Sequence, residues 1–295
     1  MNIEYRIATN ITFNHVIEKI ENLTFPPIRK KIKSMPIHEP YTGVWAMRNN
    51  EILGLILAAD NKQGIAELFS FFVKPEERNK GIGSQLLSML ETTLQKQGLK
   101  YIRALYRSDW KSIEYIEKLL TNNNWESPVL LRTITEGDFS KYSEVVWPTT
   151  KFPSDYSMFN WEELTNEDRK EIDILIKAGE VPNELNPFQH EDRIFMPGSL
   201  GLRYKNKLIG WNIVYQLNPE TLEYNNLYIK DGFRKLGHSI TMLHRSFDKQ
   251  YESKIPKAAW ILYANNPSAM KTAVRIAGKY VYKLVEEKIS RKLLN

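Results

Sequence analysis

Apolar positions in the first half of the chain follow two different periodicities. Short runs rich in aromatic and β-branched residues predict buried strands, whereas apolar residues that recur every three or four positions predict amphipathic helices. The run from Leu68 to Val73 is of the first kind, and Pro75 ends it because proline has no N–H for a strand ladder. These patterns predict strands at residues 3–9, 41–47, 52–59, 69–73, 101–106 and 129–134, and helices at 13–23, from the Gly81 loop to about 97, and at 112–120. Elements in this order predict an α+β fold, with helices layered on a sheet.

The second half of the chain repeats this pattern. When the sequence is shifted by 156 residues, the separation of Val73 from Ile229, several features coincide without a gap. The matched features are Glu67 with Glu223, Arg78 with Arg234, Gly81 with Gly237, Ser112 with Ser268, Asn50-x-x-x-Gly54 with Asn206-x-x-x-Gly210, and residues 3–9 with 159–165. We therefore expect two domains of one fold, at 1–138 and 157–295. The linker between them, 139–156, contains Trp147-Pro148 and Phe152-Pro153, and its prolines disfavour regular structure.

The loop after the strand that ends at Val73 contains Arg78-x-x-Gly81-x-Gly83. Two glycines allow close approach of the backbone, and free N–H groups at a helix N-terminus form an anion site suited to phosphate. Leu86 stands where a dinucleotide-binding Gly-x-Gly-x-x-Gly would place its third glycine. The longer pattern Val-x-Pro-x-x-Arg-x-x-Gly-x-Gly, at residues 73–83, resembles the pyrophosphate-binding motif of the GNAT acetyltransferase superfamily.

The resemblance implies two GNAT-like domains, each a mixed, mostly antiparallel twisted sheet flanked by helices. It also implies the cofactor acetyl-coenzyme A (acetyl-CoA) and transfer of its acetyl group to a primary amine of a small molecule, peptide or protein. Main-chain groups of Phe71, Phe72 and Val73 are then expected to hold the pantetheine arm. The backbone N–H groups expected to hold the pyrophosphate are those of Arg78, Asn79, Lys80, Gly81, Ile82, Gly83 and Ser84, with added charge from the Arg78 and Lys80 side chains.

The catalytic groups are less clearly indicated. Glu67 is the only acidic residue on the predicted strand, so it is the candidate general base. A solvent-exposed carboxylate at the strand end or a structural ion pair would also explain it, and the matched Glu223 supports a structural role as much as a catalytic one. Many relatives protonate the leaving thiolate with a tyrosine, whose matched position here is Ile116. Tyr115 beside it would point about 100° away on the helix. This leaves Tyr106 or water as the acid, or a chain that catalyses poorly.

The second copy differs where a phosphate would bind. Ser239 replaces Gly83, Asp231 replaces Pro75, and His238 follows the remaining glycine. A side chain at the close approach and a carboxylate near the anion both weaken such a site. We expect the first domain to bind the cofactor and the second to shape the acceptor pocket or support the first. The polar segment Phe188–Arg193 is a candidate acceptor loop in the second domain, or a plain surface loop.

Composition narrows the class of protein. The 295 residues include no cysteine and carry a net charge of +6, which excludes disulfides and cysteine metal sites and permits anionic ligands. The five histidines show no metal-binding spacing, so no metal is expected, and no membrane span or nucleic-acid module is recognisable. We expect a cytoplasmic protein, a monomer or a homodimer. The alternatives are transfer of another acyl or aminoacyl group, and a coenzyme A-binding sensor or interaction protein without turnover.

Overall fold

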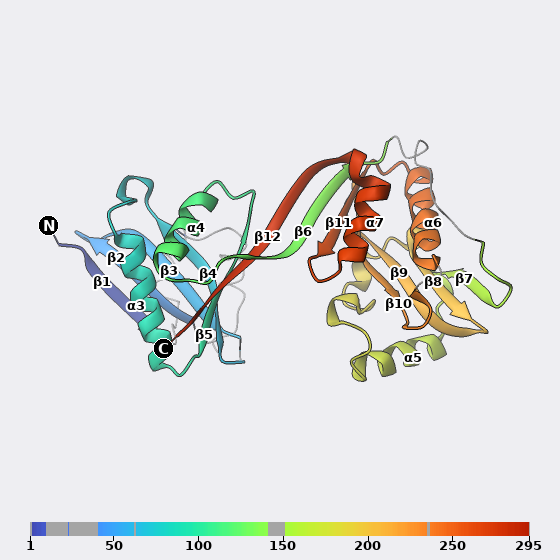
Figure 1. Ribbon diagram of the computed structural model, residues 1–295, viewed down its shortest axis with the longest axis horizontal. Helices are drawn as coiled ribbons and strands as arrows, with labels where there is room; N and C mark the ends of the chain where they lie inside the picture. Colours follow the sequence, from blue (N-terminus) through green and yellow to red (C-terminus); the bar gives the residue numbers. More distant parts are fainter. Residues whose placement is uncertain are drawn as a thin grey trace. The chain divides into compact units, whose positions relative to one another are not determined.

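The computed structural model describes residues 2–9, 23, 41–61, 63–140, 151–234 and 237–294, and these divide into two compact units. Unit 1 comprises the chain up to Leu131 together with the residues from Glu286 onward, and unit 2 comprises Arg132–Val285. Each unit has a mixed, mostly antiparallel sheet with helices packed on it, as the resemblance of residues 73–83 to the GNAT motif implies (Figure 1). The expected helix at 13–23 and the linker residues Trp147-Pro148 lie outside the described part of the chain.

Unit 1 contains a sheet with the strand order β1-β2-β3-β4-β5-β12. Its elements are β1 (Glu4–Thr9), β2 (Tyr41–Arg48), β3 (Glu51–Asp60), β4 (Ile65–Val73), the 3-10 turn η3 (Pro75–Glu77), α3 (Ile82–Lys96), β5 (Tyr101–Arg107), α4 (Ile113–Asn122) and the last part of β12 (Val281–Leu293). The helix α3 has Leu86, Leu87 and Leu90 at helical spacing, and all three are fully buried against one face of the sheet. The opposite face carries a second apolar cluster that includes Trp45 and Leu57.

Unit 2 contains a sheet with the order β6-β11-β10-β9-β8-β7. Its elements are β6 (Val129–Asp138), β7 (Tyr156–Asn160), η5 (Trp161–Glu163), α5 (Asn166–Lys177), η6 (Asn183–Leu185), η7 (Glu191–Arg193), η8 (Met196–Gly198), β8 (Leu200–Tyr204), β9 (Lys207–Asn218), β10 (Thr221–Ile229), α6 (His238–Glu252), β11 (Lys257–Tyr263), α7 (Pro267–Ala277) and η10 (Gly278–Tyr280). The strand expected at 159–165 is instead β7, which ends at Asn160. The reason is local: Asn160 begins a capped 3-10 turn, and Thr165 caps α5 through the backbone N–H of Asp168.

Two strands occupy positions that the repeat did not indicate. The strand expected to close the first domain, at 129–134, is part of β6, and its residues Arg132–Asp138 pair antiparallel with β11 of unit 2. Conversely, Glu287–Leu293 of β12 pair antiparallel with β5 of unit 1. The division of the chain therefore differs from the expected 1–138 and 157–295. The two copies of the repeat have similar strands and similar sheet edges. The periodicity of the sequence therefore does not determine which of the two edges each strand joins.

The matched glycines Gly54 and Gly210 both pack closely against a neighbouring strand, and the space for a side chain is smaller at Gly210. A Cβ on Gly210 would lie 2.6 Å from the backbone oxygen of Tyr228, whereas a Cβ on Gly54 would lie 3.0 Å from the oxygen of Phe72. We expect Gly210→Ala to lower the free energy of unfolding by about 2 kcal/mol, because a backbone oxygen cannot move aside without shifting β10. Gly54→Ala is the matched control and should cost less in urea unfolding. Equal losses in the two variants would contradict the steric argument.

Candidate active site

The strands β4 and β5 of unit 1 separate part-way along their length. They form a parallel ladder in which Ile65–Leu68 pair with Tyr101–Ala104, but β4 continues to Val73 and β5 to Arg107. A β-bulge lies at the point of separation, since Ala58 of β3 pairs with Leu68 while Leu57 pairs with Ser70. Beyond the bulge, the β5 side of residues 69–73 has main-chain groups that this ladder does not use. Such groups need hydrogen-bond partners when they are buried, so the opening suits a ligand with amide groups.

The loop that follows β4 leads to the N-terminus of α3. Gly81 has φ 81°, a left-handed conformation that favours glycine, and it caps the helix without a side-chain hydrogen bond. The Gln85 N–H donates to the Gly81 oxygen at 3.1 Å, which is the first hydrogen bond of the helix. The N–H groups of Ile82, Gly83 and Ser84 therefore have no acceptor within the helix and carry its positive dipole end. This arrangement fits a pyrophosphate.

Two residues that are expected to contact the phosphate, Arg78 and Lys80, have partners within the protein. The Arg78 Nε donates to the Val73 oxygen at 3.0 Å, so this side chain stabilises the turn from β4 into the loop. The Arg78 backbone N–H donates to the Pro75 oxygen at 3.3 Å. The Lys80 Nζ lies 3.3 Å from a carboxylate oxygen of Glu77. The glycines and the first helical turn therefore contribute more free donors than the residues before them.

Gly83 is held close to two side chains. A Cβ at this position would lie 3.4 Å from atoms of both Phe71 and Leu119, which is the limit of ordinary contact. Phe71 and Leu119 both pack against the core beneath α3. Gly83 thus permits close packing of the first helical turn on β4 as well as close approach of a ligand.

Glu67 lies on β4 opposite Arg103 of β5, within the parallel ladder. The Arg103 Nε donates to Glu67 Oε1 at 2.8 Å, and the glutamate side chain remains one-quarter exposed. The matched Glu223 of unit 2 also pairs with an arginine, but this arginine is Arg193 of η7, at 3.2 Å. Burial raises the pKa of Glu223. Both copies therefore contain the ion pair that the structural interpretation anticipated, and in unit 1 the carboxylate is also accessible.

The tyrosines near the expected acid position do not converge on it. Ile116, at the family's tyrosine position, packs against the core of unit 1. Tyr115 is 54% exposed, with the Arg78 guanidinium 5.8 Å from its ring centre. Tyr106 is buried, and burial raises its pKa to about 12, so its hydroxyl stays protonated at neutral pH. Because Tyr106 is buried, it can donate a proton only to a group that enters the opening between β4 and β5.

Unit 2 has the same backbone arrangement as unit 1 at the matched strands, loop and helix, with different side chains. The parallel ladder of β10 and β11 joins Thr221–Tyr224 to Lys257–Trp260, a register shift follows, and Gly237 caps the N-terminus of α6 with φ 76°. The Arg234 Nε donates to the Ile229 oxygen at 2.8 Å, as Arg78 does to Val73. The repeat is therefore present in the hydrogen bonds as well as in the sequence.

The start of α6 is covered by aromatic rings. His238, the first residue of the helix, is 3% exposed, and its ring centre lies 4.9 Å from that of Phe152 and 4.4 Å from that of Tyr156. Burial lowers the pKa of His238. Phe152, expected in the linker, thus packs on unit 2. An apolar cover of this kind does not suit a pyrophosphate.

Comparison with known proteins agrees with the geometry of unit 1. Residues 15–120 match the model of the acetyltransferase (GNAT) family. Unit 1 contains a GNAT acetyltransferase domain. No curated protein matches the chain closely enough to count as a relative.

Solved structures extend the likeness to both units. A tandem GNAT protein from the clavulanic acid biosynthesis pathway is 12% identical, with a TM-score of 0.60, and the match covers 100% of this chain and 99% of that one. A GCN5-related N-acetyltransferase from Sphaerobacter thermophilus is 12% identical with a TM-score of 0.58, covering 99% of this chain and 96% of that one. A GCN5-related N-acetyltransferase from Kribbella flavida is 10% identical with a TM-score of 0.53, covering 99% of this chain and 71% of that one. The chain therefore has the tandem GNAT fold.

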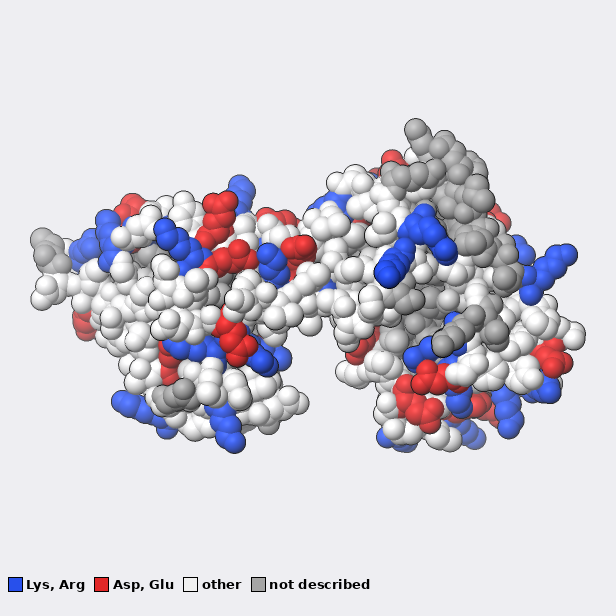
Figure 2. Space-filling view, in the orientation of Figure 1, with Lys and Arg blue, Asp and Glu red and all other residues white. Residues whose placement is uncertain are grey.

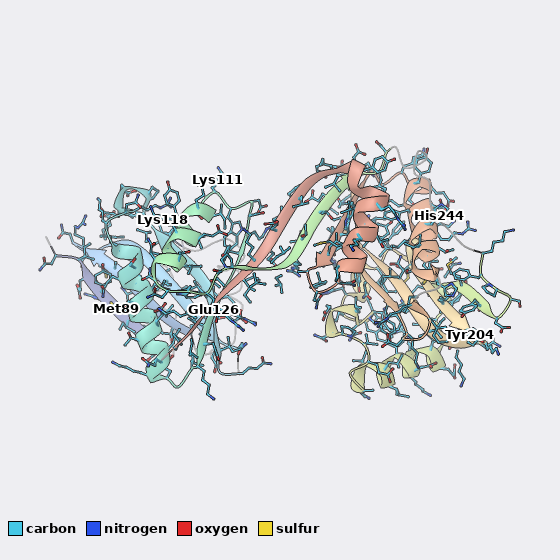
Figure 3. All side chains as sticks on the ribbon, viewed as in Figure 1. Met89, Lys111, Lys118, Glu126, Tyr204 and His244 are labelled. Atoms are coloured by element: carbon cyan, nitrogen blue, oxygen red, sulfur yellow. The ribbon has the colours of Figure 1, made fainter. Side chains whose placement is uncertain are left out.

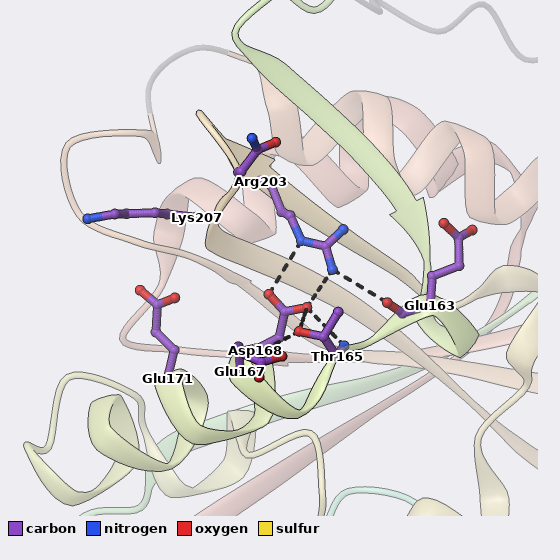
Figure 4. Close-up of a pocket in the computed structure, with 8 residues that line it drawn as sticks. Glu163, Thr165, Glu167, Asp168, Glu171, Arg203 and Lys207 are labelled. Carbon is purple, nitrogen blue, oxygen red and sulfur yellow. Dashed lines mark hydrogen bonds and ion pairs between the residues drawn. The ribbon is translucent and has the colours of Figure 1, made fainter.

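A hollow of about 440 Å³ lies in unit 2 (Figure 4). It is lined by Glu163, Thr165, Glu167, Asp168, Glu171, Arg203, Asn206 and Lys207. Its buried carboxylate has a structural explanation. Burial raises the pKa of Asp168, but hydrogen bonds from Arg203 and from Thr165 together outweigh burial, so the pKa lies below its usual value. Asp168 thus caps α5 and pairs with Arg203.

The described residues also bear on surface charge, metal binding and membrane crossing. Basic and acidic side chains are interspersed on the face of each unit shown in Figure 2. Among the described residues, no cluster of histidine and carboxylate side chains could hold a metal ion. No described helix has the length and apolar character that a membrane crossing requires.

Proposed function

We propose that the GNAT domain of unit 1 is an acetyl-CoA-dependent N-acetyltransferase whose acceptor is a primary amine of a small molecule, peptide or protein. The observation that carries this proposal is the opening between β4 and β5, followed along the chain by the free N–H groups at the start of α3. A strand opening that offers amide partners and a helix terminus that offers anion donors match the two halves of coenzyme A. When bound, acetyl-CoA supplies the acetyl group as a thioester.

The chain's own residues would then divide the work. The backbone N–H groups of Gly81, Ile82, Gly83 and Ser84 hold the pyrophosphate, with those of Asn79 and Lys80 at its edge, and main-chain groups of Phe71, Phe72 and Val73 hold the pantetheine arm. Holding both parts places the acyl carbon near the acceptor, which removes most of the entropy cost of the encounter. The Arg78 side chain contributes indirectly, because its hydrogen bond to the Val73 oxygen stabilises the turn after β4.

Glu67 is the proposed general base. An acceptor amine is protonated at neutral pH and must lose a proton before it can attack. The Glu67 carboxylate accepts that proton directly or through water, and Arg103 orients the carboxylate through its hydrogen bond. Tyr106 is the candidate donor to the departing sulfur, and burial, which raises its pKa to about 12, makes it a weaker acid than an exposed tyrosine.

Unit 2 is proposed to bind no cofactor. Its loop shares the left-handed glycine and the arginine anchor of unit 1, but rings of Phe152 and Tyr156 lie against His238 at the start of α6.

A coenzyme A-binding protein without turnover is the second candidate. The observation in its favour is Ile116, which packs in the core where many GNAT enzymes place the tyrosine acid. This candidate shares the cofactor site and differs only in the chemistry.

Isothermal titration of acetyl-CoA into the full chain, followed by an amine panel, tests the proposal. We expect one cofactor per chain and thiol release with at least one class of amine. Two cofactors per chain would contradict the assignment of unit 2. Binding without turnover over the panel would support the second candidate, turnover only with longer thioesters would point to another acyl group, and no binding at all would overturn the proposal.

A further inference from the structure

An ion pair lies under the expected phosphate loop of unit 1. Arg48, the last residue of β2, donates to both carboxylate oxygens of Glu77, from Nη1 at 2.9 Å and from Nη2 at 3.1 Å. Glu77 ends η3, the turn that leads into the loop, and its side chain is 10% exposed. A two-pronged pair of this kind constrains orientation as well as distance. It ties the end of the β2–β3 hairpin to the loop.

The carboxylate at this place needs an explanation. An anion next to a pyrophosphate site opposes the ligand unless a cation neutralises it. Hydrogen bonds from Arg48 hold the pKa of Glu77 below its usual range despite its burial, so it is charged at neutral pH. Lys80 contributes a second, more exposed cation at 3.3 Å. Arg48 is therefore the main counter-charge for an acid that the loop itself carries.

The second copy shows what happens when the same positions carry no charge. With the 156-residue shift, Arg48 matches Tyr204 and Glu77 matches Phe233. The rings of Tyr204 and Phe233 lie 5.3 Å apart, and both contact Tyr156 (Tyr204 is labelled in Figure 3). Unit 2 thus joins the same hairpin end to the same loop by an aromatic contact. The charged pair occurs in the copy that has both loop glycines.

We propose that Arg48 is a positioning residue for the cofactor, which fixes the phosphate loop through Glu77 and neutralises the carboxylate that would otherwise repel the pyrophosphate. This inference rests on the proposed function for its ligand, but the link from Arg48 to the loop is a property of the free protein. The two parts can therefore be measured separately.

The pair makes an asymmetric prediction for substitutions. Arg48→Met leaves a buried carboxylate in the loop with only the more exposed Lys80 beside it, which is worse than removing both charges. We expect Arg48→Met to weaken acetyl-CoA binding about tenfold or more, and Arg48→Met/Glu77→Met to return the affinity to within about threefold of wild type. Arg48→Lys, which keeps the charge but not the two-pronged geometry, should fall between them.

The matched control is Arg203→Met in unit 2. Arg203 and Asp168 form a pair that is at least as buried, so its loss tests whether destabilisation alone weakens the cofactor. We expect Arg203→Met to lower the melting temperature and leave acetyl-CoA affinity unchanged.

Amide hydrogen exchange in the free protein supplies the second readout. The backbone N–H groups of Glu77, Arg78 and Gln85 are hydrogen bonded within the loop and the first helical turn, so their exchange reports its order. We expect faster exchange at these amides in Arg48→Met and recovery in the double variant.

Unchanged exchange in Arg48→Met would overturn the positioning role whether or not the cofactor binds. If exchange follows the prediction but wild type binds no acetyl-CoA, the proposed function fails while the link between Arg48 and the loop stands. Equal loss of affinity in the single and double variants would refute the charge argument.

Discussion

Gly81→Val combined with Gly83→Val should raise the dissociation constant of acetyl-CoA by about a hundredfold or more. Gly81 has φ 81°, where a β-branched residue is strained, and the Cβ of a side chain at position 83 would lie 3.4 Å from both Phe71 and Leu119. Both changes therefore displace the backbone N–H groups that are proposed to hold the pyrophosphate. Each lost hydrogen bond to a charged group is worth about 1.5–3 kcal/mol, so losing one or two accounts for a change of this size. Isothermal titration measures it directly.

The second unit provides the control for this loop variant. Gly237 has φ 76° at the start of α6, so Gly237→Val introduces the same backbone strain at the matched position. We expect it to lower thermal stability and leave cofactor affinity unchanged, because unit 2 is proposed to bind none. Wild-type affinity in the Gly81/Gly83 variant would refute the phosphate site, and weakened binding in Gly237→Val would show that unit 2 takes part.

Glu67→Gln should lower kcat for amine acetylation by about a hundredfold or more and change the cofactor dissociation constant by less than about twofold. An amide of the same shape keeps a hydrogen-bond acceptor for Arg103 but cannot take up the acceptor's proton, and such proton transfer contributes about 10²–10⁴ in rate. The measurement is a full pH–rate profile with saturating cofactor.

Two further variants separate catalysis from structure. Glu223→Gln changes the matched residue of unit 2 and should leave the rate unchanged. If Glu67→Gln keeps the wild-type rate at every pH and only the melting temperature falls, Glu67 serves the ion pair with Arg103 and the base is elsewhere.

The two units show how one backbone arrangement supports different chemistry. Both have the strand opening, the bulge, the left-handed glycine and the arginine that bonds back to the strand end. The differences are side chains: Gly83 against Ser239, and an ion pair against an aromatic contact beneath the loop. Fold alone thus does not decide whether a unit binds a cofactor, and the proposals rest on these residues.

Some features of this protein follow from the sequence by itself. The strand, loop and helix around Val73 and Gly83 could be predicted because they depend on neighbours in the chain: proline ends a strand, glycine permits positive φ, and leucines at helical spacing bury one face. The repeat could be found for the same reason, since matched residues fall at one constant shift, and it predicted the tandem arrangement. The repeat was least accurate for the first strand of the second copy. This strand lies at Tyr156–Asn160, because a capped 3-10 turn begins directly after Asn160.

Other features were decided only by tertiary structure. The sequence offers no sign that Arg103 meets Glu67, that Arg48 reaches Glu77, or that Phe152 covers His238, because each partner is chosen by packing between distant elements. The strongest case is the exchange of β6 and β12, whose residues pair with the sheet of the other copy. Hydrophobic periodicity specifies that a strand needs an edge. It cannot specify which of two equivalent edges the strand takes, since that choice depends on chain connectivity and on contacts that form only when both units fold.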